Sequence, residues 1–322
     1  MIGLGFLIIS SVIGAGFATG AELVAFFGAR NISPLMASFS VSVFILLLSA
    51  LILWIEKSKK DDKTPIYFRV IYFIFFCAMT AGIFELAGWF GAALSLVLCI
   101  SIVLFGFDKV VLINKYLIFF ILAVLFTVDL TNMGEVPSID ISSPLTAFSW
   151  ALLYAGMNVC LLGTLFKTAL KKYSARKIFV SCSLAAKIIG SLVFLTLSAI
   201  YSNEAQGHAM PVLALSNNFI TYTAIFLSIF TSQVISLFNL SVGKEKTPRV
   251  SHLALFCALG FFSIFIGFNH IVGIFYPAVG MFMIFYVICC LILQIARHRT
   301  QHQEKQRASR PLSVAQPPSR HP

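Results

Sequence analysis

A short run near the start of the chain places an acidic residue next to several glycines inside an apolar stretch. The run from Ser10 to Glu22 reads SSVIGAGFATGAE and has three glycines between positions 14 and 20. Each glycine costs a helix about 1 kcal/mol relative to alanine, so we expect the helix to unwind from Gly14 to Gly20. The half-helix beginning near Phe17 would then present free N–H groups, which favour the binding of a carboxylate.

The chemistry of this run has more than one interpretation. We predict a substrate-binding loop at Gly14, Ala15 and Gly16, because these small residues let a ligand approach their main-chain amides. Alternatively, Gly16 and Gly20 form a small-xxx-small contact for tight helix packing. The G-x-G-x-x-x-G spacing, with no strand before it, is not a dinucleotide fingerprint. Glu22 is suited to binding a cationic group of the substrate, carrying a proton or capping the pathway mouth.

The composition identifies the class of protein that must position these residues. Hydrophobic residues make up 59% of the chain and charged residues 11%, and the mean hydropathy is +0.95. Since a spanning helix needs roughly 20 apolar residues, we predict an all-α polytopic membrane protein. Ten transmembrane helices can be drawn, near 2–28, 34–55, 66–86, 88–106, 110–128, 145–166, 178–201, 217–241, 250–268 and 271–294.

The basic residues predict the orientation of these spans. Most loop cations follow the even-numbered spans, so the positive-inside rule places both termini in the cytoplasm, in the plasma (bacterial inner) membrane. The net charge of +11 is therefore explained by topology, and we expect membrane lipids and a small-molecule solute as partners, with no nucleic acid. We expect residues 297–322 to form a disordered basic cytoplasmic tail, because they are almost devoid of apolar residues.

The ten spans divide into two halves of five. We predict a first repeat at 1–128, an extracytoplasmic loop at 129–144 and a second repeat at 145–296. Five is odd, so the second half crosses the membrane inverted, and span 6 becomes the counterpart of span 1. Its midpoint contains Tyr154, Gly156 and Asn158, which we interpret as a second break that lines the substrate site.

The run IGAGFATGAE at Ile13–Glu22, with the chain length and ten-span plan, resembles the YkvI family of bacterial membrane proteins. That family is grouped with the amino acid–polyamine–organocation transporters, which share the 5+5 inverted repeat of the leucine transporter, with helices 1 and 6 broken. The resemblance implies a secondary transporter whose helix 1 loop, Gly14 to Phe17, holds a substrate carboxylate. It also implies a Na⁺ site where Thr231 and Ser232 on helix 8 face the carbonyls of Ser10 and Ile13. Alternatively, these hydroxyls only bond to their own helix.

One basic residue is predicted deep in the membrane. Lys187 lies about ten residues from the cytoplasmic end of its span, near the midplane at a rise of about 1.5 Å per residue. It either replaces a coupling ion, pairs with an acid or extends its ammonium toward the cytoplasm.

These features favour one function over two others. We predict a secondary active transporter of a small polar or zwitterionic solute, such as an amino acid or amine, coupled to Na⁺ or H⁺ by alternating access. The alternative is a non-transporting sensor or receptor subunit that keeps the same fold. An enzyme is not expected, because no Ser–Lys or Ser–His arrangement, histidine cluster or pair of membrane aspartates is present. We expect no cofactor and no metal beyond Na⁺.

Overall fold

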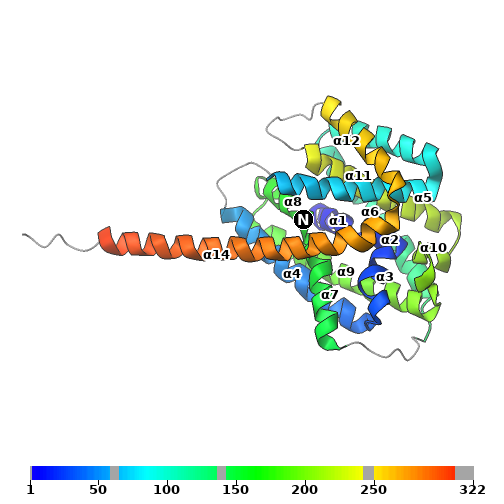
Figure 1. Cartoon of the computed structure of the whole chain (residues 1–322), viewed down its shortest axis with the longest axis horizontal. Coiled ribbons are helices and arrows are strands. Elements are labelled where there is room, and N and C mark those ends of the chain that lie inside the picture. The colour runs from blue at the N-terminus through cyan, green and yellow to red at the C-terminus, as the bar shows by residue number, and fades with distance from the viewer. Residues whose placement is uncertain (1, 59–64, 136–142, 242–249, 309–322) are drawn as a thin grey trace, which may run out of the picture. The chain divides into compact units, whose positions relative to one another are not determined.

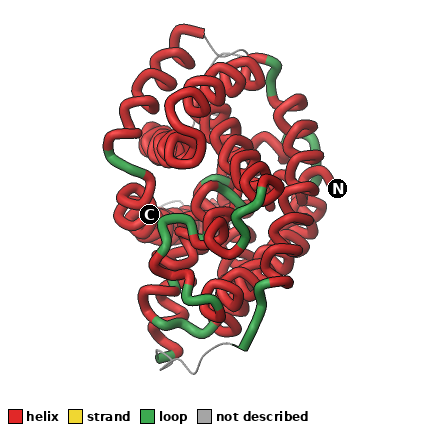
Figure 2. The backbone as a smooth tube through the Cα atoms, turned by 90° about the vertical axis from the view of Figure 1, so that its right-hand side faces the viewer, coloured by secondary structure: helices red, strands yellow, loops and turns green. Residues whose placement is uncertain are grey.

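The computed structural model describes residues 2–58, 65–135, 143–241 and 250–308. Every regular element in these ranges is helical, as Figure 2 shows. Six helical segments are long and apolar enough to cross a membrane: Pro34–Ser58, Ile66–Leu104, Leu112–Thr131, Ala175–Ser202, Phe219–Ser241 and Phe268–Ala296. The expected all-helical membrane protein is thus confirmed.

The first apolar segment is interrupted twice. Helix α1 (Ile2–Val12) is followed by α2 (Ala15–Thr19), α3 (Ala21–Phe26) and the short 3-10 helix η1 (Gly28–Arg30), coloured blue in Figure 1. Gly14 is extended, with φ −91° and ψ −163°, and Gly20 is left-handed, with φ 81°. The predicted interruption is present at Gly14 and at Gly20, but the expected unwinding of the whole stretch between them is wrong, because Ala15–Thr19 forms a short helix.

Three long helices follow. They are α4 (Pro34–Ser58), α5 (Ile66–Leu104) and α6 (Phe107–Thr131). Gly88, with φ 64° and ψ −166°, interrupts α5 in a conformation that a residue with a Cβ rarely adopts.

The expected start of the loop at residue 129 is wrong. Helix α6 continues to Thr131, and the Asp129 side chain is completely buried. The Thr196 hydroxyl donates to its carboxylate over 2.5 Å. That bond offsets part of the cost of burying Asp129, which explains why the acid stays on the helix.

The remaining helices begin after the undescribed residues 136–142. They are α7 (Pro144–Cys160), α8 (Leu162–Leu170), α9 (Ala175–Ser202), η2 (Ala205–Gly207), α10 (Pro211–Leu215), α11 (Phe219–Ser241), α12 (Val250–Phe262), η3 (Ser263–Phe265), α13 (Phe268–His270), the π-helix η4 (Ile271–Phe275) and α14 (Tyr276–Ala308). The π-helix ends two residues before Pro277, whose missing N–H disturbs the regular hydrogen-bond pattern of the helix.

The prediction of a disordered tail from residue 297 is wrong for its first part. Helix α14 continues through Ala308, while residues 309–322 lie outside the described part of the chain. Extending a formed helix needs no new nucleus, and the Gln, Lys, Arg and Ala residues here are good helix formers. By compactness the chain divides into Met1–Ile284 and Phe285–Pro322, and the candidate site lies wholly within the first unit.

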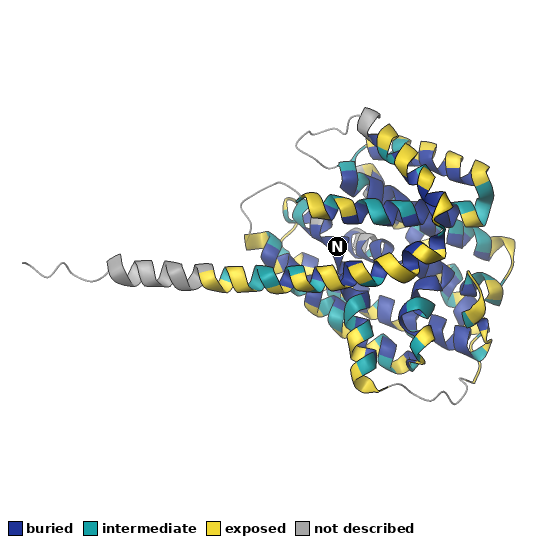
Figure 3. Cartoon of the chain, in the orientation of Figure 1, coloured by how far each residue is buried: buried dark blue, intermediate teal, exposed yellow. Residues whose placement is uncertain are grey.

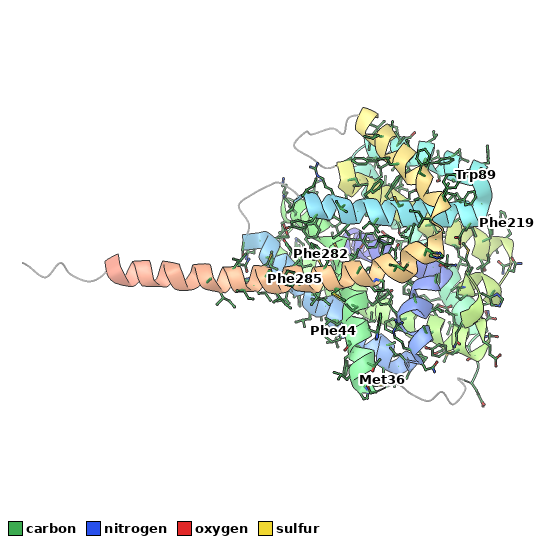
Figure 4. All side chains as sticks on the ribbon, in the orientation of Figure 1. Met36, Phe44, Trp89, Phe219, Phe282 and Phe285 are labelled. Atoms are coloured by element: carbon green, nitrogen blue, oxygen red, sulfur yellow. The ribbon has the colours of Figure 1, made fainter. Side chains whose placement is uncertain are left out.

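Within the first unit, α1, α2 and α11 form the centre. Helix α11 packs against α5, α6 and α2, and α4 packs against α9 and α7. Figure 3 shows the broken segment mostly in the colour of buried residues, whereas large apolar side chains such as Trp89 and Phe219, labelled in Figure 4, are exposed. An apolar exterior around a partly polar interior suits a lipid environment.

We predict that Gly20→Ala destabilises the protein by about 1–3 kcal/mol. The left-handed backbone disfavours alanine, and the added Cβ would lie 3.0 Å from Ile200 Cδ1 and 3.1 Å from Pro211 Cβ. Thermal unfolding in detergent measures the effect. Gly163→Ala in α8 is the control, because its Cβ would meet no atom within 4 Å and its melting temperature should not fall.

Candidate functional site

Glu22 lies in the first turn of α3 with its side chain 2% exposed. The side chain lies across Gly16, since a Cβ there would be 2.1 Å from Glu22 Cγ and 2.3 Å from Oε1. Gly16 is therefore small because the carboxylate of Glu22 occupies the space beside it. The break in the first helix is what lets residues only six positions apart meet in this way.

Two tyrosines approach the same carboxylate from other helices. Tyr154 of α7 and Tyr276 at the start of α14 are fully buried, and both phenols interact electrostatically with Glu22. Glu22 Oε2, Tyr154 Oη and Tyr276 Oη each lack a hydrogen-bond partner among the described residues. We call these three side chains the Glu22 cluster. Unpaired buried polar atoms cost about 1–3 kcal/mol each, so such a cluster requires a functional explanation.

Aromatic rings surround the cluster. The Tyr154 ring centroid lies 5.3 Å from that of Phe26 and 5.4 Å from that of Phe27. Beyond them, the Trp150 ring packs edge-on against Phe26 at 6.1 Å, and the Arg30 guanidinium lies 3.2 Å from the centroid of the Trp150 ring. These π faces can attract a cation as well as exclude water.

The Phe75 ring packs against Tyr276 at 5.0 Å on another side of the cluster. Figure 1 shows that the helices contributing these rings are spread along the sequence, from α3 through α5 and α7 to α14.

The predicted break at Gly156 is wrong. Residues 144–160 form the continuous helix α7, and the interruption comes at Leu161, which keeps helical φ and ψ angles of −66° and −22°. A single glycine costs too little to unwind a helix that is packed tightly. A Cβ at Gly156 would lie 2.8 Å from the Gly280 carbonyl oxygen, so this glycine permits a close helix crossing.

The other predicted residues of span 6 have separate roles. Tyr154 belongs to the Glu22 cluster, but Asn158 Nδ2 donates to the Tyr154 carbonyl oxygen over 3.0 Å within α7. Asn158 is buried, and its amide interacts electrostatically with the Tyr154 phenol as well. Asn158 therefore positions Tyr154 from one turn along the helix.

The hydroxyls of α11 meet the end of α1 where the first helix breaks. Ser228 Oγ donates to the Ile13 carbonyl oxygen over 2.8 Å, and Ser232 Oγ donates to the Ser10 carbonyl oxygen over 3.4 Å. The predicted partner Thr231 instead donates to Ser228 O within its own helix. Ser228 was missed, although it lies four residues before Ser232 and hence on the same helix face.

The remaining candidates lie in different surroundings. Phe17 on α2 is fully buried, and a Cβ at Gly14 would meet Ser232 Oγ at 3.1 Å and Met79 Cε at 3.3 Å. Side chains thus occupy the space beside both loop glycines. Helix α2, which begins at Ala15, has only five residues, so its summed peptide dipole is weak. Lys187 is exposed on α9, and the structure does not bring it to the Glu22 cluster.

Two functional contacts had no clear signal in the sequence. Tyr276 is a single tyrosine before Pro277, and only the fold brings it to Glu22. Glu85 accepts a hydrogen bond from the Phe268 N–H over 2.9 Å, so this acid caps the helix that follows Gly267. Among the described residues, no three His, Cys, Asp or Glu side chains gather in a way that could hold a metal ion.

Comparison with known proteins gives structural likenesses but no family. No family model matches the chain, and no curated protein matches it. A crystal structure of the Eremococcus coleocola manganese transporter, in complex with an aromatic bis-isothiourea substituted compound, aligns with 95% of this chain and 73% of its own length. The identity is 15% and the TM-score is 0.46, too low to support any statement about cargo or mechanism.

We predict that Gly16→Ala destabilises the protein by about 1–3 kcal/mol because the new Cβ displaces the Glu22 side chain. In a Glu22→Ala background the same Cβ has room, so the two effects should not add. A double-mutant cycle of unfolding free energies should give a coupling of about 1 kcal/mol or more. Additive effects would mean that Glu22 does not lie against Gly16.

Proposed function

We propose that the protein is a secondary active transporter of a small polar solute, a class that includes amino acids and amines. The observation that carries the proposal is the Glu22 cluster beside a broken helix in the centre of an apolar bundle. A buried acid in a membrane protein marks a substrate or ion pathway by default. Irregular backbone at membrane depth is tolerated where protein covers it or where it lines a cavity.

We further propose ten spans arranged as two inverted repeats of five. Gly88 supports this count because it divides the 39-residue helix α5 into two parts, each close to the length of one crossing. The interrupted segments α1–α3 and α7–α8 then occupy the first position of each repeat. The resemblance of Ile13–Glu22 to the YkvI family agrees with this plan, and rests on that motif alone.

The loop charges support an orientation with both termini in the cytoplasm of a bacterial inner membrane. Lys57, Lys109 and Lys171 follow alternate proposed spans, as the positive-inside rule requires. With this orientation, Glu22 lies in the outer half of the first span and Arg30 just beyond its outer end.

Two groups are candidates for coupling transport to an ion gradient. The first comprises Ser228, Ser232 and the carbonyls of Ser10 and Ile13, which offer hard oxygen ligands suited to Na⁺. The second is Glu22, which can carry a proton when no cation is bound. Lys187 is not proposed in this role, because its side chain is exposed.

Transport should depend on Glu22. We expect purified protein in liposomes to accumulate at least one member of a labelled amino acid and amine panel, driven by an inward Na⁺ or H⁺ gradient. Glu22→Gln should reduce the uptake rate by about tenfold or more, since it removes a charged hydrogen-bonding partner. Lys187→Met is the control and should transport like the wild type.

Saturable binding without accumulation under either gradient would contradict transport and favour a sensor or receptor subunit. Full uptake by Glu22→Gln would remove the cluster from the mechanism.

Sodium binding should depend on the serines that face α1. We expect added NaCl, compared with equal KCl, to raise the melting temperature of the wild type, and Ser228→Ala or Ser232→Ala to remove most of that increase. Thr231→Val is the matched control, because the Thr231 hydroxyl bonds within α11. An unchanged sodium effect in both serine variants would mean that sodium binds elsewhere and would contradict this site.

A further inference from the structure

The Glu22 cluster contains an acid but no compensating base. Helices α2, α3, α7 and α11 and the π-helix η4 contain no Lys, Arg or His. Arg30, just beyond α3, is engaged with the Trp150 ring and donates to the Ala25 carbonyl oxygen. The nearby His270 and the more distant Lys187 are both exposed. None of these basic groups is placed to neutralise a charged Glu22, so the acid is charged only when a cation binds beside it and otherwise carries a proton.

The geometry beside Gly16 disfavours a substrate carboxylate. An anion placed against this loop would meet Glu22 Oε1, which lies 2.3 Å from the position of a Cβ on Gly16. At Gly14 the approach is closed by Ser232 and Met79. Like charges in a low-dielectric interior repel strongly, so an amino acid would bind with its carboxylate against an unfavourable field.

The unpaired atoms match a particular cation. Glu22 Oε2, Tyr154 Oη and Tyr276 Oη are three buried oxygens that make no hydrogen bond among the described residues and can each accept one, and an alkylammonium group has three N–H donors. The rings of Phe26, Phe27 and Tyr154 supply an apolar, π-rich surface for the carbon chain and for the charge. A transition metal would find no group of three or more His, Cys, Asp or Glu ligands here among the described residues.

We propose that the Glu22 cluster binds the ammonium group of a primary alkylamine that lacks a carboxylate, with Glu22 as its counterion and the two phenols as acceptors. This inference rests on the proposed function and narrows its substrate class from polar solutes in general to primary amines.

A matched set of ligands tests the proposal by calorimetry on the purified protein at neutral pH. Isopentylamine is leucine without its carboxylate, and isocaproate is leucine without its amine. We expect isopentylamine to bind at least about tenfold tighter than leucine, and isocaproate to show no binding. Tetramethylammonium has no N–H donor and should bind about tenfold more weakly than isopentylamine.

Substitutions locate the binding. Glu22→Gln should weaken isopentylamine binding about 10–100-fold, and Tyr154→Phe or Tyr276→Phe about 3–10-fold each. Glu22→Gln should melt at the wild-type temperature or above it, because it replaces a buried acid with a neutral side chain of the same size, so lost binding will not reflect unfolding. Asp129→Asn, which alters a buried acid paired with Thr196, is the control and should bind isopentylamine normally.

The outcomes separate this inference from the proposed function. Any of four results would overturn the amine assignment. Leucine could bind as tightly as isopentylamine or more tightly, or Glu22→Gln could leave amine binding unchanged. The protein could instead bind MnCl₂ through Glu22, or bind none of the probes. Gradient-driven uptake of another solute would still support the proposed transporter function. Isopentylamine that binds through Glu22 but never accumulates would instead overturn transport and leave the binding site intact.

Discussion

One buried carboxylate constrains this structure more than any other group. Glu22 is 2% exposed in an apolar bundle, and its side chain fills the space over Gly16. A continuous helix would separate positions 16 and 22 by about 9 Å along its axis and place them on different faces. The break at Gly20 brings them together, so the acid can be buried over Gly16 only because the helix is interrupted at Gly20. Both positions are glycines because Gly20 must adopt the left-handed conformation and Gly16 must leave room for the Glu22 side chain.

Breaking a helix leaves main-chain groups that must find partners elsewhere, since the membrane interior offers no water. Helix α11 supplies them at the end of α1, where Ser228 and Ser232 donate to the carbonyls of Ile13 and Ser10. Tyr201 performs a similar role at the other end, because its hydroxyl donates to the carbonyls of Phe27 and Ile32. The irregular segment is therefore held at both ends by side chains of other helices, while the Glu22 cluster between them keeps three unpaired oxygens.

Sequence reasoning succeeded where composition and local conformation decide the outcome. The apolar runs and the three glycines between positions 14 and 20 predicted membrane helices and an interrupted first segment, and both are present.

Sequence reasoning failed where tertiary packing decides the structure. Gly156 was interpreted as a break, yet it stays helical because the Gly280 carbonyl approaches it closely, and that contact depends on a residue 124 positions away. Similarly, Asp129 was placed in a loop, but Thr196 of another helix supplies the donor that keeps it buried. Tyr276 joined the site for the same reason, since only the fold brings it to Glu22.

The two interrupted segments are consequently unequal, although an inverted repeat would relate them. The first provides the acid and the irregular backbone, whereas the second remains helical through Gly156 and contributes Tyr154 from a regular turn. If the protein works by the proposed alternating access, the conformational change has little freedom at α7, where the backbones of Gly156 and Gly280 approach each other closely. The freedom lies in α2 and α3, which are short and joined through the left-handed Gly20. Because Glu22 is on α3 and Tyr154 on α7, a rotation at Gly20 would separate acid from phenol. Binding of a cation between them would oppose that separation and couple the site to the position of α3.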